Sequence, residues 1–450
     1  MAIEVEPAAP AEGAWKGRPA GLPGVVPPPS VPLAFFVAAA AGLVACGIAW
    51  IWARNWAALD PSADPVVAAV HFGVLAALST GVLGAAHQFT PVITGRALRS
   101  VVLARATFVC WLVGAWLLPI GVATEGRAVT GVGGAAAGVA VVLLALNLSG
   151  PLAQRGKGTP VTALRLALIG AIATCFLGVA FVGDRQGHWF DLSPHVDLAM
   201  GIVGLLGWLG LTYVGVAEKL WPMFMLAHLP GRRRAGRVAV WSVAVGTTAF
   251  ASGLAFGVAG LDWAGAAVLS VGLGAHLVSL ALYVAHRRRR ADLHLAFVVT
   301  AAAWLVVGAG LGLAAGLELP HRYHLGVALS AGALAAVAGW LLEALVGHAH
   351  KVVPFIAWSA LRARGVATGS SGKPLLFADL YDHTWARITY VLVTAGILAL
   401  CVGLSASRPV VTAVAGVLLA LTGIVVALNL SLRPVRLVAT SSPTPTDRGQ

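Results

Sequence analysis

The chain has 450 residues, of which 59% are apolar and 10% are charged, and its mean hydropathy is +0.87. Soluble domains carry about 25% charged residues. This composition excludes a soluble enzyme, a disordered scaffold and a nucleic-acid-binding protein, even though the net charge is +13. Because a helix of about 20 apolar residues crosses a bilayer, we expect an all-α membrane protein.

Twelve apolar segments long enough to cross a bilayer follow one another along the chain. They cover approximately 33–53, 65–90, 98–121, 129–150, 161–183, 195–228, 236–258, 262–287, 293–317, 323–350, 386–406 and 409–430. Residues 32–436 are therefore predicted to form one membrane domain. The flanking residues 1–31 and 437–450 are predicted to be disordered cytoplasmic tails, because they lack the apolar residues that build a core.

The basic residues predict the orientation of these spans. With the N-terminus in the cytoplasm, 25 of the 30 Lys and Arg residues fall in or beside cytoplasmic segments. The exceptions are Arg54, Arg127, Arg185, Arg322 and Arg408. Cytoplasmic loops of membrane proteins carry such an excess, so we expect a multi-pass protein of the cytoplasmic (inner) membrane with both termini inside. The lipid bilayer is the expected partner, and the basic charge serves orientation rather than nucleic-acid binding.

One motif occurs three times, as Gly84-AAHQFT-Pro91, Gly215-VAEKLW-Pro222 and Gly347-HAHKVV-Pro354. The glycines are 131 and 132 residues apart, and each motif ends an even-numbered span, namely the second, sixth and tenth. A fixed period of four spans preserves orientation, so the repeats should be parallel and related by an axis along the membrane normal. We predict twelve transmembrane helices in three pseudo-symmetric four-helix arcs.

The motif also has a purely structural interpretation. The proline would end or kink its helix, the glycine would allow a close helix contact, and the polar residues would reach the interface. The polar residue four positions before each proline is His87, Glu218 or His350.

Three stretches carry a resemblance to a known family. They are HFGVLAALSTGVLGAAHQFTP, which begins at His71, then GWLGLTYVGVAEKLWPMF and GWLLEALVGHAHKVVPFIAW. Together with twelve spans in three arcs, they resemble the catalytic subunit of the heme–copper oxidase superfamily, cytochrome c oxidase subunit I and its NnrS-like relatives included. The resemblance implies haem b held by His71 and His324, and a copper ligand at His195. It also implies respiratory-chain or cytochrome partners.

The chain departs from the family pattern at several positions. Span seven contains no histidine, Ala199 stands where many oxidases have a tyrosine, and His321 with His324 gives H-x-x-H rather than H-x-H. A complete oxygen-reducing copper centre is therefore not expected. His71 lies 20 residues before its shared proline and His324 lies 30 before its own, which is a depth difference of about 15 Å. An outer-face metal site, with copper as a candidate, around His195, His321 and His324 stays open.

Two carboxyl groups fall inside predicted spans. Glu343 lies eleven residues before Pro354, and Glu218 lies near the end of span six. Ionisable residues inside a membrane are costly and often serve proton or ion paths, so both are candidates for a proton path. His348 and His350 would extend that path, bind metal, or simply lie at the interface.

Three functions are consistent with these residues. The first is a haem-binding protein in electron transfer or in the handling of nitric oxide or oxygen. The second is a transporter of a small solute or a metal ion such as copper, because parallel repeats with midplane carboxylates also suit a carrier. The third is an assembly role in a respiratory complex. Whether the protein is an enzyme stays open.

Overall fold

The computed structural model describes residues 25–154, 158–187, 195–227, 234–366 and 374–432. Most of the predicted tails, residues 1–24 and 437–450, lies outside the described residues. The described part is 87% helical and contains no strand. Twelve helices in it are long and apolar enough to cross a membrane, which confirms a multi-pass, all-α membrane protein with twelve spans.

Ten of these spans contain one α-helix each. They are α1 (Ser30–Leu59), α4 (Val101–Ala123), α5 (Arg127–Leu152), α6 (Thr159–Gly187), α9 (Arg234–Phe256), α10 (Ala259–Ala285), α11 (Leu293–Glu318), α12 (Tyr323–Ala363), α13 (His383–Ser405) and α14 (Pro409–Val426), which continues as η4 (Ala427–Leu432). The second span consists of α2 (Asp64–His71), η1 (Phe72–Ser79) and α3 (Thr80–Thr94). The sixth consists of α7 (Val196–Ile202), η2 (Val203–Gly210) and α8 (Leu211–Met225). The short helix η3 (Phe377–Leu380) precedes α13.

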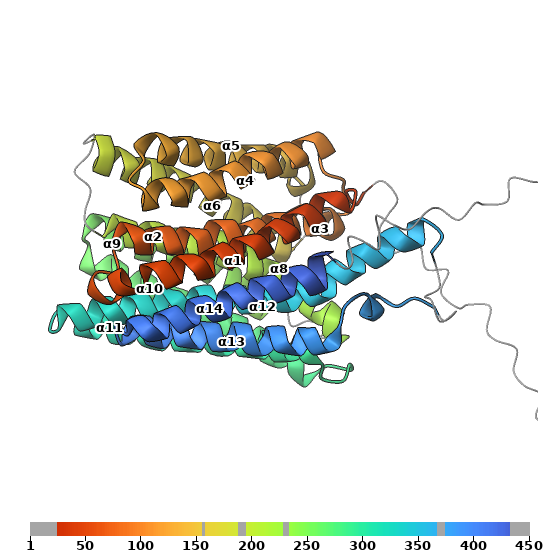
Figure 1. Cartoon of the computed structure of the whole chain (residues 1–450). Coiled ribbons are helices and arrows are strands. Elements are labelled where there is room, and N and C mark those ends of the chain that lie inside the picture. The colour runs from red at the N-terminus through yellow and green to blue at the C-terminus, as the bar shows by residue number, and fades with distance from the viewer. Residues whose placement is uncertain (1–24, 155–157, 188–194, 228–233, 367–373, 433–450) are drawn as a thin grey trace, which may run out of the picture.

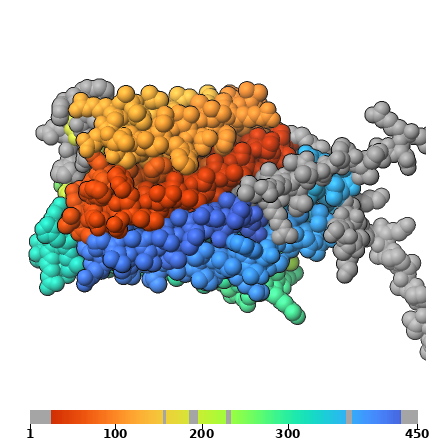
Figure 2. Space-filling view, in the orientation of Figure 1, coloured from red at the N-terminus to blue at the C-terminus, as the bar shows by residue number. Residues whose placement is uncertain are grey.

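The helices run side by side, and the chain enters at α1 and leaves at η4 on the same end of the bundle (Figure 1). We call this end, towards which Pro91, Pro222 and Pro354 lie, the proline end. On the face shown in Figure 2, the first two spans lie between the α4–α5 pair and the α13–α14 pair. An even number of spans explains why both ends of the described chain meet there.

The three motif glycines make equivalent contacts with the span before them. A Cβ added at Gly84 would collide with Phe35 of α1, and one at Gly347 would collide with Phe297 of α11. At Gly215 the collision would be with Ala163 of α6. The motif glycines therefore permit close helix packing, as the structural interpretation predicted.

The motif prolines act differently from one another. Helices α3 and α8 both end three residues after their proline, each with a left-handed residue at the C-cap. Helix α12 instead continues nine residues past Pro354, so of the two expected effects, ending or kinking the helix, this proline does not end its helix. Apolar contacts of Leu361 and Ala357 with Leu380 of η3 stabilise this extension.

Further features recur between the first and last four spans. Asn147 accepts a hydrogen bond from the backbone N–H of Ser100 at 2.9 Å, and Asn429 accepts one from Asp382 at 2.8 Å. Ser100 and Asp382 are the N-caps of α4 and α13, and each side chain accepts bonds from its own first turn. The same hydrogen-bond arrangement thus fixes the start of both helices, and in each case the N-cap residue and its asparagine are 47 residues apart.

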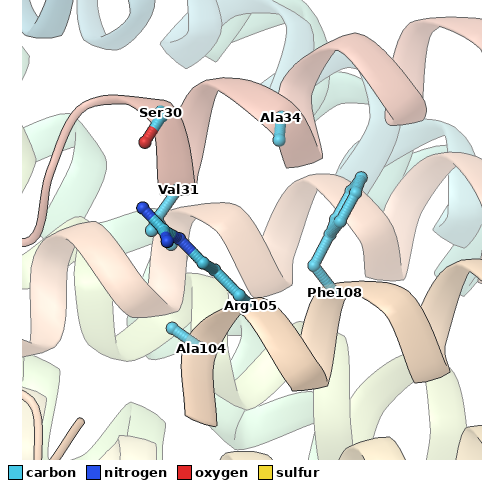
Figure 3. Close-up of a pocket in the computed structure, with 6 residues that line it drawn as sticks. All are labelled: Ser30, Val31, Ala34, Ala104, Arg105 and Phe108. Atoms are coloured by element: carbon cyan, nitrogen blue, oxygen red, sulfur yellow. The ribbon is translucent and has the colours of Figure 1, made fainter. Parts of the chain in front are cut away.

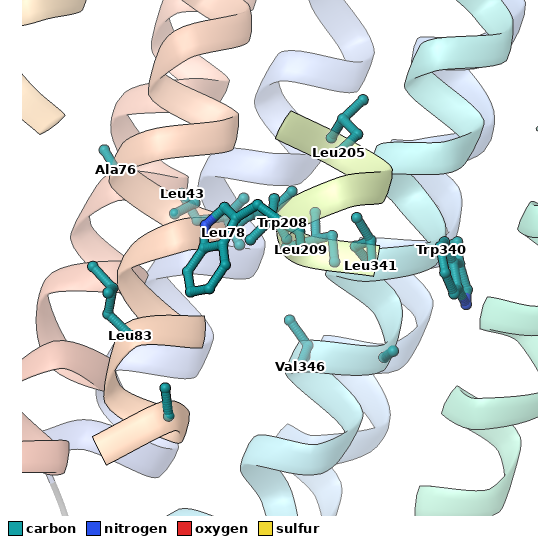
Figure 4. Packing of buried hydrophobic residues seen from close by; sticks show 14 of the residues in the cluster. Leu43, Ala76, Leu78, Leu83, Leu205, Trp208, Leu209, Trp340, Leu341 and Val346 are labelled. Atoms are coloured by element: carbon teal, nitrogen blue, oxygen red, sulfur yellow. The ribbon is translucent and has the colours of Figure 1, made fainter. Parts of the chain in front are cut away.

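The π-helices η1 and η2 occupy equivalent positions, since each begins 19 residues before its motif proline. The corresponding part of α12 is a regular α-helix. Apolar side chains of these three spans meet in the middle of the bundle, among them Leu78, Trp208 and Leu341 (Figure 4). The centre of the described bundle is therefore filled by a close-packed apolar core.

Candidate functional site

Glu343 is the most deeply buried carboxyl group of the described chain, with 0% exposure in the middle of α12. Thr394 of α13 donates a hydrogen bond to its Oε1 at 3.0 Å. Its Oε2 has no hydrogen-bond partner among the described residues. The Trp304 indole of α11 lies beside the same carboxyl group, but its N–H does not reach hydrogen-bond geometry. A buried polar atom without a partner is costly, so this carboxyl group needs a functional explanation.

A second polar pair lies one helical turn nearer the proline end, between α11 and α13. Thr300 of α11 and Tyr390 of α13 join their hydroxyl groups at 2.8 Å. Thr300 lies four residues before Trp304 on α11, and Tyr390 lies four residues before Thr394 on α13. Four residues are about one helical turn. Thr394 and Tyr390 therefore place the two pairs in successive layers along α13.

His350 forms the next layer and lies two turns beyond Glu343 on α12. It is 3% exposed, and its Nδ1 donates to the Val346 carbonyl at 2.8 Å. In the neutral ring, Nε2 then carries the lone pair, and it has no partner among the described residues. The ring stacks on Phe297, with centroids 5.3 Å apart, and Phe297 meets Tyr390 edge-on. We call Glu343, Thr394, Thr300, Tyr390 and His350 the polar line.

Charged residues lie where the polar line reaches the proline end. Lys351 donates to Asp292 at 2.6 Å, and Arg289 lies 3.7 Å from the same carboxylate. Tyr381 lies edge-on to His350, with ring centroids 5.8 Å apart. Burial and the negative charge of Asp292 raise the pKa of Tyr381, and Arg289 opposes this shift. This end of the line thus lies beside charged groups that are partly exposed, since the side chains of Arg289 and Asp292 are 43% and 33% exposed.

A separate group of rings fills the space between α8, α10, α11 and α12. His276 of α10 lies 4.7 Å from Trp221 and 5.5 Å from Tyr213, measured between ring centroids. Tyr213 in turn lies 5.6 Å from His348, which lies 4.9 Å from His294. His276 is 1% exposed. It lies in the middle of span eight and was absent from the sequence predictions, although a histidine within a span is itself a functional signal.

Of the other two motif positions, His87 resembles His350 and Glu218 does not. His87 stacks on Phe35 and donates to the Leu83 carbonyl at 2.8 Å, so its geometry matches that of His350. Glu218 is partly buried and accepts a hydrogen bond from the Tyr283 hydroxyl at 3.3 Å. Glu218 therefore sits in the second repeat, apart from the polar line around Glu343.

The predicted haem and metal ligands lie at the opposite end of the bundle. His71 is partly buried and donates from Nδ1 to the Val67 carbonyl at 2.7 Å. His324, its predicted partner, is exposed in the first turn of α12, with Tyr323 as its ring contact. Among the described residues, no hydrogen bond or ring contact joins His71 to His324.

His195 and His321, the predicted metal ligands, are both exposed, His195 at the N-cap of α7. Among the described residues, no group of three or more His, Cys, Asp or Glu side chains is placed to hold a metal ion. The haem and metal assignments therefore stay predictions.

No protein-family model matches the chain, and no curated protein matches it. The resemblance to the oxidase subunit consequently rests on the sequence stretches alone and stays a prediction.

Proposed function

We propose that this protein is a transporter that moves protons, alone or coupled to a small solute or metal ion, on a three-arc scaffold like that of the oxidase subunit. The observation that carries the proposal is the polar line, which leads from the proline end to a buried carboxyl group. Buried ionisable side chains at membrane depth are typical of proton relays.

The spacing of the polar line supports proton transfer. Successive layers are about one helical turn, or 5.4 Å, apart, a gap that one water molecule bridges. Carboxyl, hydroxyl and imidazole groups both donate and accept hydrogen bonds. The apolar core around Leu78, Trp208 and Leu341 fills the centre of the described bundle, and in the proposed carrier it would serve as the barrier that alternating access requires.

The three-arc arrangement is part of the proposal. It is supported by the equivalent glycine contacts on Phe35, Ala163 and Phe297, by the equivalent π-helices, and by the paired asparagine caps. The cytoplasmic membrane and inward-facing termini are likewise proposed from the distribution of Lys and Arg. In this orientation the proline end faces the cytoplasm, so the polar line would open to the cytoplasm.

The test is proton flux into vesicles that contain the purified protein, driven by an imposed potential and followed with an enclosed pH dye. Glu343→Gln should lower the flux at least tenfold. Glu318→Gln is the matched control, because Glu318 pairs with Arg322 at the far end of α11 and should leave the flux unchanged. Equal flux in wild type and Glu343→Gln would contradict the proposal.

Haem binding is a second candidate, favoured by the orientation of His71. Its Nδ1 donates to a carbonyl, which leaves Nε2 free in the way that ligating histidines require. Haem, when bound, would supply electron transfer or diatomic-gas binding. A Soret band in the purified protein that His71→Ala removes would support this candidate, and a folded protein without the band would exclude it.

A further inference from the structure

A lengthwise groove lies between α1 and α4. Its larger part has a volume of 740 Å³ and is lined by Ala34, Ala38 and Ala41 of α1 and by Phe108, Leu112 and Trp116 of α4. A smaller part of 300 Å³ continues it towards the proline end and shares Ala34 and Phe108 with it. Ligand sites in proteins commonly measure about 300–1,000 Å³, so this groove has room for a ligand.

Side-chain size explains the groove. Ala34, Ala38 and Ala41 recur at helical spacing and present one shallow face of α1. Phe108, Leu112 and Trp116 recur every four residues on α4, and their larger side chains form the facing wall. Because both helices lie in the bilayer, the walls of this apolar groove suit a hydrocarbon chain.

The end of the groove carries a positive charge. Arg105 lies in the second turn of α4, is exposed, and has no ion pair or side-chain hydrogen bond with any described residue. Figure 3 shows its side chain extended towards the start of α1, beside Ser30 and Val31. An arginine near the end of a span lies at headgroup depth, and guanidinium groups bind phosphate well.

We propose that this groove is a binding site for one anionic phospholipid. An acyl chain would lie along the alanine face of α1, and the lipid phosphate would bind Arg105 and the Ser30 hydroxyl. Charge complementarity selects an anionic headgroup over a zwitterionic one, since Arg105 has no acidic partner among the described residues.

The last four spans provide a matched comparison. The sequence ARATFV around Arg105 recurs as ARITYV around Arg387, with a spacing of 282 residues. Arg387 is also exposed in the second turn of its helix, α13. There, however, Tyr390 replaces Phe108, and its hydroxyl group bonds Thr300 across α11 and α13. Arg387 therefore matches Arg105 in its place on the helix and in its charge, but its neighbouring helices are joined by the bond between Tyr390 and Thr300.

The experiment is native mass spectrometry of the full-length protein, titrated after delipidation with phosphatidylglycerol or with phosphatidylcholine. Wild type should retain one phosphatidylglycerol more tightly than phosphatidylcholine. Arg105→Gln should weaken phosphatidylglycerol binding about fivefold, since a basic residue near the surface contributes about 1 kcal/mol to lipid binding. Arg387→Gln should leave this tight binding unchanged.

A second variant tests the groove itself. Ala38→Phe would fill it and should weaken binding of both lipids at this site. If this variant does not fold, the comparison of Arg105→Gln with Arg387→Gln decides alone. Equal losses in the two arginine variants, or equal retention of the two lipids by wild type, would overturn the proposal and indicate ordinary annular lipid.

Discussion

His350 stacks on Phe297 with ring centroids 5.3 Å apart and planes 24° from parallel. His87 stacks on Phe35 at the same distance, with planes at 21°. The two repeats thus share the same stacking of histidine on phenylalanine, although the residues farther along the two helices differ. Two turns before His350 lies Glu343, whereas Thr80 occupies that position before His87 and accepts a hydrogen bond from Trp111.

This difference gives the first prediction. His350→Gln should lower proton flux about tenfold or more, because it removes the imidazole between Glu343 and the proline end. His87→Gln should leave the flux unchanged, because Thr80, and not a carboxyl group, lies two turns before His87 on its span. Both variants lose a similar ring contact, worth about 0.5–1.5 kcal/mol, so their thermal stabilities should fall alike. Equal flux losses in the two variants would show that the effect is structural.

The second prediction concerns Gly347. Gly347→Ala should destabilise the protein by about 1–3 kcal/mol, because the new Cβ collides with Phe297 in a closely packed contact. Gly131→Ala is the control, since Gly131 lies in α5 with open space around it. The control should be neutral or stabilise the helix by up to about 1 kcal/mol. Thermal unfolding in one detergent compares the two, and effects of the same sign would contradict the packing explanation.

The third prediction concerns the ion pair between Asp292 and Lys351. Asp292→Asn should destabilise the protein by about 1–3 kcal/mol, because it leaves the Lys351 ammonium group, 9% exposed, without its partner. The figure is below that of a fully buried pair because Asp292 is 33% exposed. The asparagine keeps an oxygen that can cap the backbone N–H of Leu295.

The double variant Asp292→Asn, Lys351→Met measures the coupling between the two charges. It should be less destabilised than the sum of the single variants, because no charge is then left unpaired. If the loss of unfolding free energy in the double variant equals the sum of the losses in the two single variants, the two groups do not interact.

The fourth prediction concerns pH and Tyr381. Its pKa is raised above the ordinary value of 10.0 by burial, then by Asp292. Above about pH 10 the unfolded chain loses this proton while the folded chain keeps it, so stability falls as pH rises. Tyr381→Phe should flatten the fall in unfolding temperature between about pH 9 and 11. An unchanged pH profile in this variant would exclude Tyr381 as the titrating group.

The twelve spans and their repeat follow from the sequence because bilayer thickness fixes span length. The unusual setting of Glu343 was also predictable, because its position in the sequence places a carboxyl group well inside a span, where ionisation is costly. The partners of this residue were not predictable. Thr394 and Tyr390 look like ordinary polar residues of an apolar span, and only the rotation of α13 against α12 brings Thr394 to the carboxyl group.

The sequence by itself thus determined the class, the number of spans and the period of this protein, because these depend on hydropathy and spacing along the chain. Tertiary structure decided which side chains share one layer of the bundle. In a bilayer both the lipid-facing and the buried faces of a span are mostly apolar, so hydropathy does not reveal which face meets a neighbour. The polar line, the ring group around His276 and the groove beside Arg105 all depend on that choice.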